Sequence, residues 1–226
     1  MIFENRTDAG RQLASSIVAA GEASETTNTI VVGLARGGIV VAKEVASLLD
    51  VPLYSFSVDD CRIPSQEIEG GEVAVFLTGF GTATVWKTGA FEPETFFRDA
   101  EDASLANPIV LNCRKNVASQ HAIFGGMIPE DVIGKRVMLI DDGAVTGRSI
   151  IAAINAMEYA GASQIVIGIP AILNWFPDII NGHRVVSCRR SRSDYFPTGM
   201  FYDSFEDTRD NEVLQALGRV SVDASR

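Results

Sequence analysis

Short, continuously apolar runs, each followed by a glycine break, limit most strongly how this chain can fold. The first run covers residues 30–34, Gly37-Gly38 follows it, and a second run covers residues 53–58. Between the glycines and the second run, three apolar residues recur with a helical period: Val41, Val45 and Leu48. This order predicts a β-α-β unit whose two strands are parallel.

A later segment repeats this order. A strand is predicted over residues 137–140, a helix over residues 147–159 that ends before Gly161, and a further strand over residues 165–169. Strands that are apolar along their whole length are typical of parallel sheets with both faces covered. We therefore predict an α/β fold with a doubly wound, mainly parallel sheet of five or six strands.

The two ends of the chain are expected to belong to the same single domain, residues 1–226. An amphipathic helix is predicted over residues 7–21, with Thr7 as its N-cap. Near the other end, the pattern predicts a short strand over residues 184–187 and a helix over residues 208–217. No internal repeat or low-complexity linker separates these segments.

The segment between the two β-α-β units has a different pattern. Apolar residues 73–77 and 82–86 flank a glycine-rich turn, which predicts an antiparallel hairpin. A helix is expected to begin at Pro93 and to end at Asn107-Pro108. We interpret residues 59–128, approximately, as a variable insert that forms a small antiparallel hood or lid over the sheet edge.

Composition excludes several classes of protein. The 226 residues carry 19 Lys and Arg against 29 Asp and Glu, and this net charge of -10 disfavours nonspecific nucleic-acid binding. No apolar run approaches the roughly 18 residues of a membrane span, and the N-terminus lacks a signal-peptide pattern. Because Cys61, Cys113 and Cys188 form no Cys-x-x-Cys pair, neither a zinc ribbon nor a disulfide framework is expected. A cytoplasmic protein without membrane or nucleic-acid partners is favoured.

The most informative stretch runs from a predicted buried strand, through two acids, into a loop that begins a helix. Asp141 and Asp142 end the strand, and residues 143–149 follow with the sequence GAVTGRS. Small residues leave backbone N–H groups accessible and a helix N-terminus adds positive charge, so the loop is typical of a phosphate site. The hydroxyls of Thr146 and Ser149 add donors. Ligands of open α/β sheets bind at this end of the strands.

Other interpretations of this stretch stay open. The GxxxxGK[ST] loop of nucleotide triphosphatases is one residue longer and carries lysine where this chain has Arg148, and residues 33–38 lack the GxGxxG spacing of dinucleotide folds. The two acids also fit a simple turn cap. Beside an anion site, however, they need another role, such as holding sugar hydroxyls or water on magnesium. Both can line one site only if the strand bends at Asp142.

A family resemblance rests on this motif. Ile140-Asp141-Asp142-Gly143, followed by Thr146-Gly147, resembles the phosphoribosyl pyrophosphate signature of type I phosphoribosyltransferases. The opening, with Asn5-Arg6, and the tail, with Tyr202-Asp203-Ser204-Phe205, are similar to a subgroup of predicted phosphoribosyltransferases of undefined substrate. The likeness covers roughly residues 1–58 and 129–217.

The resemblance implies a role for each matching position. Asp141 and Asp142 would be the catalytic pair, holding the ribose hydroxyls and stabilising the positive charge that develops on the sugar. The 5′-phosphate would be held by the loop residues Gly143, Ala144, Val145, Thr146, Gly147, Arg148 and Ser149. Arg36, Gly37 and Gly38 would bind pyrophosphate, although the glycine pair also fits tight strand-to-helix packing.

The resemblance also implies Mg²⁺ as a cofactor. The candidates to hold it, directly or through water, are Asp141, Asp142, Asp59 and Asp60. Asp59-Asp60 stands where many relatives carry a basic pair, and this inverted charge disfavours a bare pyrophosphate unless the acids bind magnesium or point to solvent. The inversion favours ligand binding over turnover.

Two functions follow from the resemblance. The first is transfer of 5-phosphoribosyl from phosphoribosyl pyrophosphate to a nitrogen nucleophile, such as a nucleobase or similar heterocycle, with release of pyrophosphate. The second is a non-catalytic protein that binds phosphoribosyl pyrophosphate or a nucleotide and regulates a partner. A DNA-binding repressor ranks last, because the sequence has no evident helix-turn-helix or basic face. The small-molecule acceptor, and whether a homodimer completes the site, are left open.

A basic cluster near the end of the chain has two interpretations. Arg189-Arg190-Ser191-Arg192, followed by Tyr195-Phe196, fits a second anion site with a stacked base. A solvated loop with buried aromatic residues is the favoured interpretation.

Overall fold

The computed structural model describes residues 2–64, 71–86, 93, 95–97, 107–176, 180, 182–192 and 197–219. Its centre is a five-stranded sheet in the order β10-β8-β7-β1-β2, in which every neighbouring pair is parallel. The strands are β1 (Thr29–Leu34), β2 (Leu53–Phe56), β7 (Arg136–Ile140), β8 (Gln164–Gly168) and β10 (Arg184–Val186). The predicted doubly wound α/β sheet is confirmed.

Helices cover both faces of this sheet, which explains the unbroken apolar strands. Helices α1 (Arg6–Ala19) and α2 (Gly37–Leu49) pack on the face that carries Val31 and Met138. Helix α4 (Arg148–Tyr159) packs on the opposite face, with Val32 and Leu139. Alternate residues of each strand therefore enter two separate cores.

Two details of these helices differ from the sequence prediction. The N-cap of α1 is Asn5 and not Thr7, because the Asn5 side-chain oxygen accepts a hydrogen bond of 3.0 Å from the Asp8 amide. In α2, Leu48 is 55% exposed and Leu49 is buried in its place.

The middle segment forms a second, antiparallel sheet in the order β3-β4-β5-β6. Its strands are β3 (Val58–Pro64), β4 (Glu72–Thr78), β5 (Ala83–Trp86) and β6 (Thr95–Phe97). The predicted hairpin is confirmed as β4 and β5. The strand predicted over residues 53–58 is in fact divided between the two sheets, since β2 ends at Phe56 and β3 begins at Val58.

The helix predicted from Pro93 is wrong over residues 95–97, which pair with β5 as β6. Residue 94 and residues 98–106 of that prediction lie outside the described residues. Asn107-Pro108 begins a helix and does not end one: α3 (Pro108–Phe124) has Pro108 in its first turn, and the Asn107 side chain accepts from the Ile109 amide at 2.9 Å. Proline at the first helical position lacks only an N–H that would be unpaired anyway.

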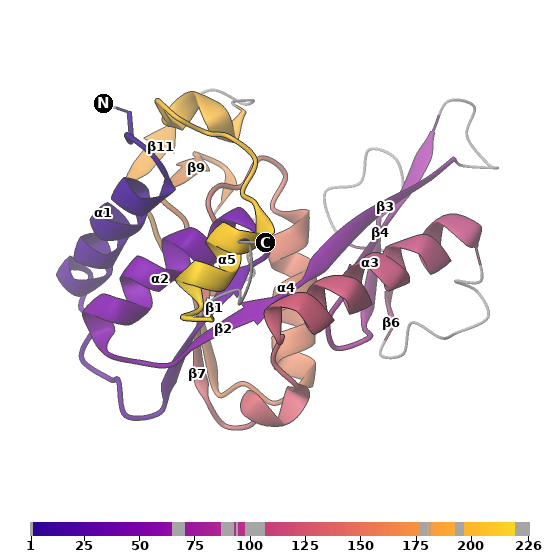
Figure 1. Cartoon of the computed structure of the whole chain (residues 1–226), viewed down its shortest axis with the longest axis horizontal. Coiled ribbons are helices and arrows are strands. Elements are labelled where there is room, and N and C mark those ends of the chain that lie inside the picture. The colour runs from indigo at the N-terminus through magenta and orange to yellow at the C-terminus, as the bar shows by residue number, and fades with distance from the viewer. Residues whose placement is uncertain are drawn as a thin grey trace, which may run out of the picture.

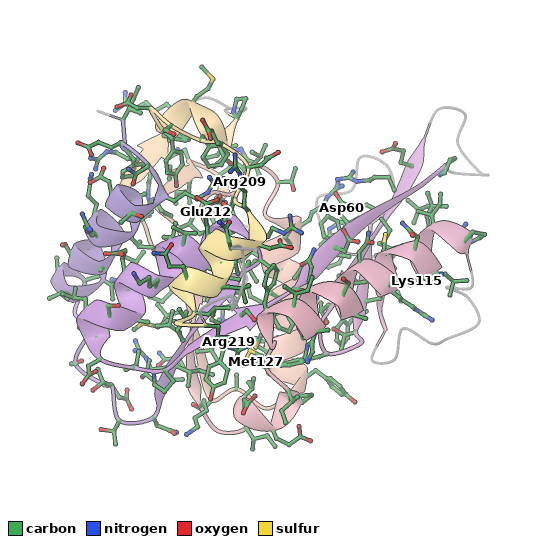
Figure 2. All side chains as sticks on the ribbon, in the orientation of Figure 1. Asp60, Lys115, Met127, Arg209, Glu212 and Arg219 are labelled. Atoms are coloured by element: carbon green, nitrogen blue, oxygen red, sulfur yellow. A yellow bond between two sulfur atoms is a disulfide. The ribbon has the colours of Figure 1, made fainter. Side chains whose placement is uncertain are left out.

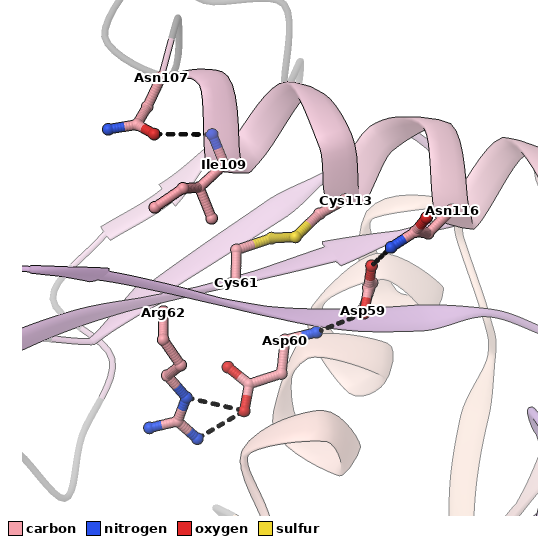
Figure 3. The surroundings of a disulfide bond; sticks show 8 residues. All are labelled: Asp59, Asp60, Cys61, Arg62, Asn107, Ile109, Cys113 and Asn116. Atoms are coloured by element: carbon pink, nitrogen blue, oxygen red, sulfur yellow. Dashed lines mark hydrogen bonds and ion pairs between the residues drawn. A yellow bond between two sulfur atoms is a disulfide. The ribbon is translucent and has the colours of Figure 1, made fainter.

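Helix α3 packs against β3, and the antiparallel sheet also contacts α4. Figure 1 shows α3 and this sheet together at one side of the parallel sheet. A disulfide between Cys61 on β3 and Cys113 on α3 joins them (Figure 3). The expectation of no disulfide was therefore wrong: the two cysteines are 52 residues apart, and only the fold brings them together.

The two ends of the chain meet beside the carboxyl ends of the parallel strands. Phe3 exchanges backbone hydrogen bonds of 2.8 Å with Phe201 and Asp203. The tail continues from the 3-10 helix η4 (Thr198–Phe201) to α5 (Asp210–Ala216), where the Arg209 amide donates to Glu212 (Figure 2). The Arg219 guanidinium donates to the Phe124 carbonyl and fastens the end of this segment to α3.

The remaining elements support this edge of the molecule. Strands β9 (Ala171–Leu173) and β11 (Arg189–Ser191) form a two-stranded parallel sheet, and the 3-10 helix η2 (Pro129–Asp131) leads into β7. Among the described helices, none has the length and apolar character needed to cross a membrane.

Candidate functional site

The acid pair lies where β7 ends. The Asp141 amide still bonds to the neighbouring strand, at Gly168, but the Asp142 amide donates back to the Asp141 carboxylate at 2.9 Å. The chain has therefore left the regular strand at Asp142, which is the bend that two adjacent acids need in order to face one site. Both carboxylates are only partly exposed.

The first turn of α2 packs directly on these acids. A Cβ atom added to Gly37 would collide with the Asp142 carboxylate, and one added to Gly38 would lie 2.9 Å from the Ile140 carbonyl. The glycine pair is thus required for close packing, as one of the two interpretations held. The same packing brings the predicted pyrophosphate residues Gly37 and Gly38 against the predicted catalytic pair.

The predicted phosphate loop presents free donors. Gly147 caps α4 with φ of +70°, a conformation that favours glycine. The first hydrogen bond of α4 runs from the Ile151 amide to the Gly147 carbonyl at 2.9 Å, and among the described residues the Ser149 and Ile150 amides have no acceptor.

These donors face a cavity of about 170 Å³. Its lining consists of Asp141, residues 143–150 and Thr198. The methyl group of Thr198 lies so close to Gly143 that a Cβ atom there would clash with it. Sequence reasoning missed Thr198, because no spacing or motif connects the tail with this loop.

Two more residues that the sequence did not assign to the site hold Asp142. The Arg6 Nε atom donates to the Asp142 Oδ2 atom at 2.7 Å. The Arg6 side chain is 14% exposed and the Asp142 side chain 16%. The Tyr202 hydroxyl donates to the Asp142 carbonyl at 2.5 Å. The only sequence signal for either residue was the family likeness of the two chain ends.

Burial and neighbouring charge change the proton affinity of this cluster. Burial raises the pKa of the Asp141 carboxyl well above its usual range, the negative charge of Asp142 adds to the increase, and Arg6 opposes it. Burial also raises the pKa of the Tyr202 phenol, again with a contribution from Asp142. Tyr202 therefore stays a hydrogen-bond donor at neutral pH.

The predicted pyrophosphate arginine has protein partners. The Arg36 Nη2 atom lies 3.1 Å from the Asp210 Oδ1 atom on α5, and both side chains are more than two-fifths exposed. The Arg36 guanidinium also lies 6.0 Å from the centre of the Phe124 ring. Exposed ion pairs of this kind are weak and exchange readily with other partners.

Arg148, at the start of α4, faces the antiparallel sheet. Its guanidinium lies 5.8 Å from the Trp86 ring centre. Burial lowers the pKa of Arg148, the positive charge of Arg62 adds to the decrease, and Asp60 opposes it. The antiparallel sheet therefore lies next to the phosphate loop, although a lid movement remains a prediction.

The inverted charge at Asp59-Asp60 is partly neutralised. The Asp60 Oδ2 atom accepts from Arg62 Nε at 2.9 Å, and the Asp59 Oδ2 atom accepts from Asn116 at 3.1 Å (Figure 3). Asp60 is thus paired with a cation and Asp59 with a neutral amide, and neither adjoins the Asp141-Asp142 pair in a metal-binding group. Within the described ranges, no group of three His, Cys, Asp or Glu side chains is arranged for a metal ion.

The Asp141-Asp142 pair nevertheless fits a magnesium ion that is held only in part by the protein. Magnesium in phosphate sites commonly takes one or two carboxylates and completes its shell with substrate phosphates and water. Two adjacent carboxylates that oppose each other's ionisation are stabilised by a nearby cation.

The basic cluster near residue 190 is partly structural. Arg189 donates to the Gln12 side chain at 3.0 Å and lies 5.4 Å from the Phe3 ring centre. Tyr195-Phe196, on which the stacked-base interpretation depends, lies outside the described residues.

Comparison with known proteins agrees with this geometry. Residues 2–173 match the family described as "Phosphoribosyl transferase domain". The chain belongs to this family. Two relatives from Mycobacterium tuberculosis, named "Putative phosphoribosyl transferase Rv0571c" and "Putative phosphoribosyl transferase MT0597", are each 29% identical over 98% of the chain. The match covers 48% of either relative, so this family member spans about half of their length.

Solved structures share the fold of this family member. TT1426 from Thermus thermophilus has a TM-score of 0.68 and 24% identity, with 96% of this chain and 98% of that chain covered. A hypothetical protein from Neisseria gonorrhoeae, solved with bound ppGpp, has a TM-score of 0.52 and 11% identity, with 95% and 96% covered. At these identities the likeness concerns the fold alone.

Proposed function

We propose that this protein transfers the 5-phosphoribosyl group of phosphoribosyl pyrophosphate to a nitrogen atom of a small molecule, such as a nucleobase or similar heterocycle, and releases pyrophosphate. One observation carries the proposal. The Asp141-Asp142 pair lies between a cavity lined by the loop at the start of α4 and the glycine turn at the start of α2. This arrangement offers separate places for the two phosphate ends of the substrate.

Each part of the site has a chemical role in this proposal. The 5′-phosphate enters the 170 Å³ cavity, where the Ser149 and Ile150 amides and the Thr146 hydroxyl donate to it. The carboxylates of Asp141 and Asp142 accept hydrogen bonds from the ribose hydroxyls. Their negative charge also stabilises the positive charge on the sugar in the transition state.

The bond changes follow from this placement. The C1–O bond breaks, its electron pair leaves with pyrophosphate, and the nitrogen lone pair forms the new C1–N bond as the nitrogen gives up its proton to water. Backbone amides of Gly37-Gly38, at the N-terminus of α2, are placed to stabilise the leaving group. The guanidinium of Arg36 joins them when its exposed pair with Asp210 opens.

Magnesium is part of the proposal, with Asp141 and Asp142 as the residues that would hold it beside the substrate's phosphates. The ion supplies charge neutralisation for the departing pyrophosphate. Asp59 and Asp60 are set aside as its ligands, because they have partners in Asn116 and Arg62.

One observation favours the second function, a non-catalytic regulatory protein. Arg36 is paired with Asp210, and this contact leaves its charge partly neutralised by the tail. If the pair persists with ligand bound, phosphoribosyl pyrophosphate would bind without losing pyrophosphate.

Pyrophosphate release separates the two functions. The protein is incubated with labelled phosphoribosyl pyrophosphate, magnesium and a panel of nitrogen heterocycles. Release that depends on one of these acceptors supports the transferase, and tight binding without release supports the regulator. Asp142→Asn should abolish acceptor-dependent release, whereas Asp203→Asn, at an exposed aspartate of the neighbouring segment, should leave it unchanged. No binding by the unaltered protein would refute both functions.

A further inference from the structure

Asp142 is held by both ends of the chain at once. Arg6 comes from the first turn of α1 and Tyr202 from the tail, and they bond respectively to the side chain and the backbone carbonyl of Asp142. The glycine turn of α2 closes the remaining side, since even a Cβ atom at Gly37 would lie 2.6 Å from the Arg6 Nε atom. The orientation of this carboxylate is thus fixed by three segments that are far apart in the sequence.

Arg6 itself is firmly fixed. Its Nη1 atom donates to the Glu206 carbonyl at 2.6 Å, and its guanidinium lies 3.9 Å from the centre of the Phe205 ring. Phe205 in turn stacks on Tyr202 with ring centres 4.7 Å apart. A planar guanidinium held on three sides presents its Nε–H in one direction, toward Asp142.

The arrangement also has an electrostatic consequence. Two adjacent, partly buried carboxylates repel each other, and the Arg6 charge offsets that repulsion. The charged or titratable groups that face the pair are Arg6 from α1 and Tyr202 from the tail, while α2 contributes the backbone of Gly37-Gly38. Arg6 is therefore a positive charge placed directly against the Asp142 carboxylate.

We propose that Arg6 and Tyr202 are positioning residues of the transfer reaction, an inference that rests on the proposed function. Arg6 fixes the direction of the Asp142 carboxylate. Tyr202 fixes the backbone turn from which that carboxylate projects. The two chain ends thus set the geometry of the ribose-binding acids without contacting the reacting atoms.

Four variants test this assignment. Arg6→Met keeps the length of the side chain and removes its charge, Arg6→Lys restores the charge, and Tyr202→Phe removes only the hydroxyl. Arg11→Gln is the matched control, because Arg11 lies on the same helix and pairs with Glu44 away from the acids. Thermal unfolding of each variant identifies any that has lost its fold.

The first measurement is a crystal structure of each variant without ligand. Arg6→Met removes the 2.7 Å hydrogen bond to the Asp142 Oδ2 atom, so the Asp142 carboxylate should rotate away from its direction in the unaltered protein. Arg6→Lys should recover most of that direction, and Arg11→Gln should leave it unchanged. An unchanged Asp142 carboxylate in Arg6→Met would overturn the inference, whether or not the protein is a transferase.

The second measurement is the affinity for phosphoribosyl pyrophosphate with magnesium. Arg6→Met leaves the Asp142 carboxylate without its charged hydrogen-bond donor, so it should bind about tenfold more weakly, and Arg6→Lys should recover most of that affinity. Tyr202→Phe should also bind more weakly, and Arg11→Gln should bind as the unaltered protein does. A loss in Arg6→Met that lysine does not rescue would indicate a purely structural role and overturn the assignment. Failure of the unaltered protein to bind would instead refute the proposed function.

Discussion

Gly37→Ala should damage the site while leaving the fold intact. The added methyl group would lie 2.6 Å from the Arg6 Nε atom, where ordinary contacts begin at 3.4 Å, and closer still to the Asp142 Oδ2 atom. The carboxylate must therefore move by roughly 1 Å. A displacement of that size in a positioned group lowers the reaction rate about 10²-fold, which is about 2.7 kcal/mol in the activation free energy. Asp142 can rotate away, because the colliding atom is the end of a side chain.

The effect on stability should be small. Position 37 begins α2, where alanine is a better helix former than glycine by about 1 kcal/mol, and this gain offsets part of the lost Arg6–Asp142 pair. The rate of acceptor-dependent pyrophosphate release measures the loss, and thermal unfolding measures stability. Gly79→Ala is the control, since its nearest new contact would be 3.6 Å away. A release rate for Gly37→Ala that equals the control's would refute the close-packing argument.

Two further changes test other parts of the account. Thr146→Val removes one hydroxyl from the phosphate cavity, and we expect an affinity loss of about 1.5 kcal/mol, the value of a hydrogen bond to a charged group; an unchanged dissociation constant for ribose 5-phosphate would contradict the placement of that phosphate. Reducing the Cys61–Cys113 disulfide opens a loop whose ends are 52 residues apart, so chain entropy predicts a loss of about 4 kcal/mol in the free energy of unfolding. Denaturant unfolding with and without reductant measures this loss, and a Cys113→Ser variant, which should not respond to reductant, is the control. Identical unfolding midpoints for the untreated and the reduced protein would refute a stabilising role of the disulfide.

The parallel sheet was predictable from the sequence because its signals are local. Each central strand is apolar at successive residues, as at Val31 and Val32, and each is followed by a break and a helical period. Burial on both faces leaves polar residues only at the first position of β1, β7 and β8, and successive apolar residues along each strand pack against the layer above and the layer below. The phosphate loop is equally local, since strand, acids, loop and helix follow one another without interruption.

The antiparallel insert was less predictable because its signals fit two structures. Phenylalanine occurs in helices and in strands, so Phe96 did not indicate which of the two forms here. The strand forms because this segment pairs with β5. Asn107-Pro108 fits both the end of one helix and the beginning of another. In the structure it begins a helix, because the Asn107 side chain caps the Ile109 amide. Tertiary contacts and not local propensity select the structure in both places.

The site residues that come from the two chain ends could not be predicted, for a different reason. Arg6, Thr198 and Tyr202 reach the acids and the loop only after the two chain ends have come together. A contact such as that of Arg6 with Asp142, 136 residues apart, has no spacing that a single sequence can reveal. The family likeness pointed to these end segments without giving their roles.

The most direct test of the account is a crystal structure of the protein with phosphoribosyl pyrophosphate and magnesium. The account predicts the 5′-phosphate in the cavity at the start of α4, with its oxygens about 3 Å from the Ser149 and Ile150 amides, and the ribose hydroxyls on Asp141 and Asp142. A substrate phosphate bound elsewhere, with this cavity empty and the acids directed away from the sugar, would contradict it.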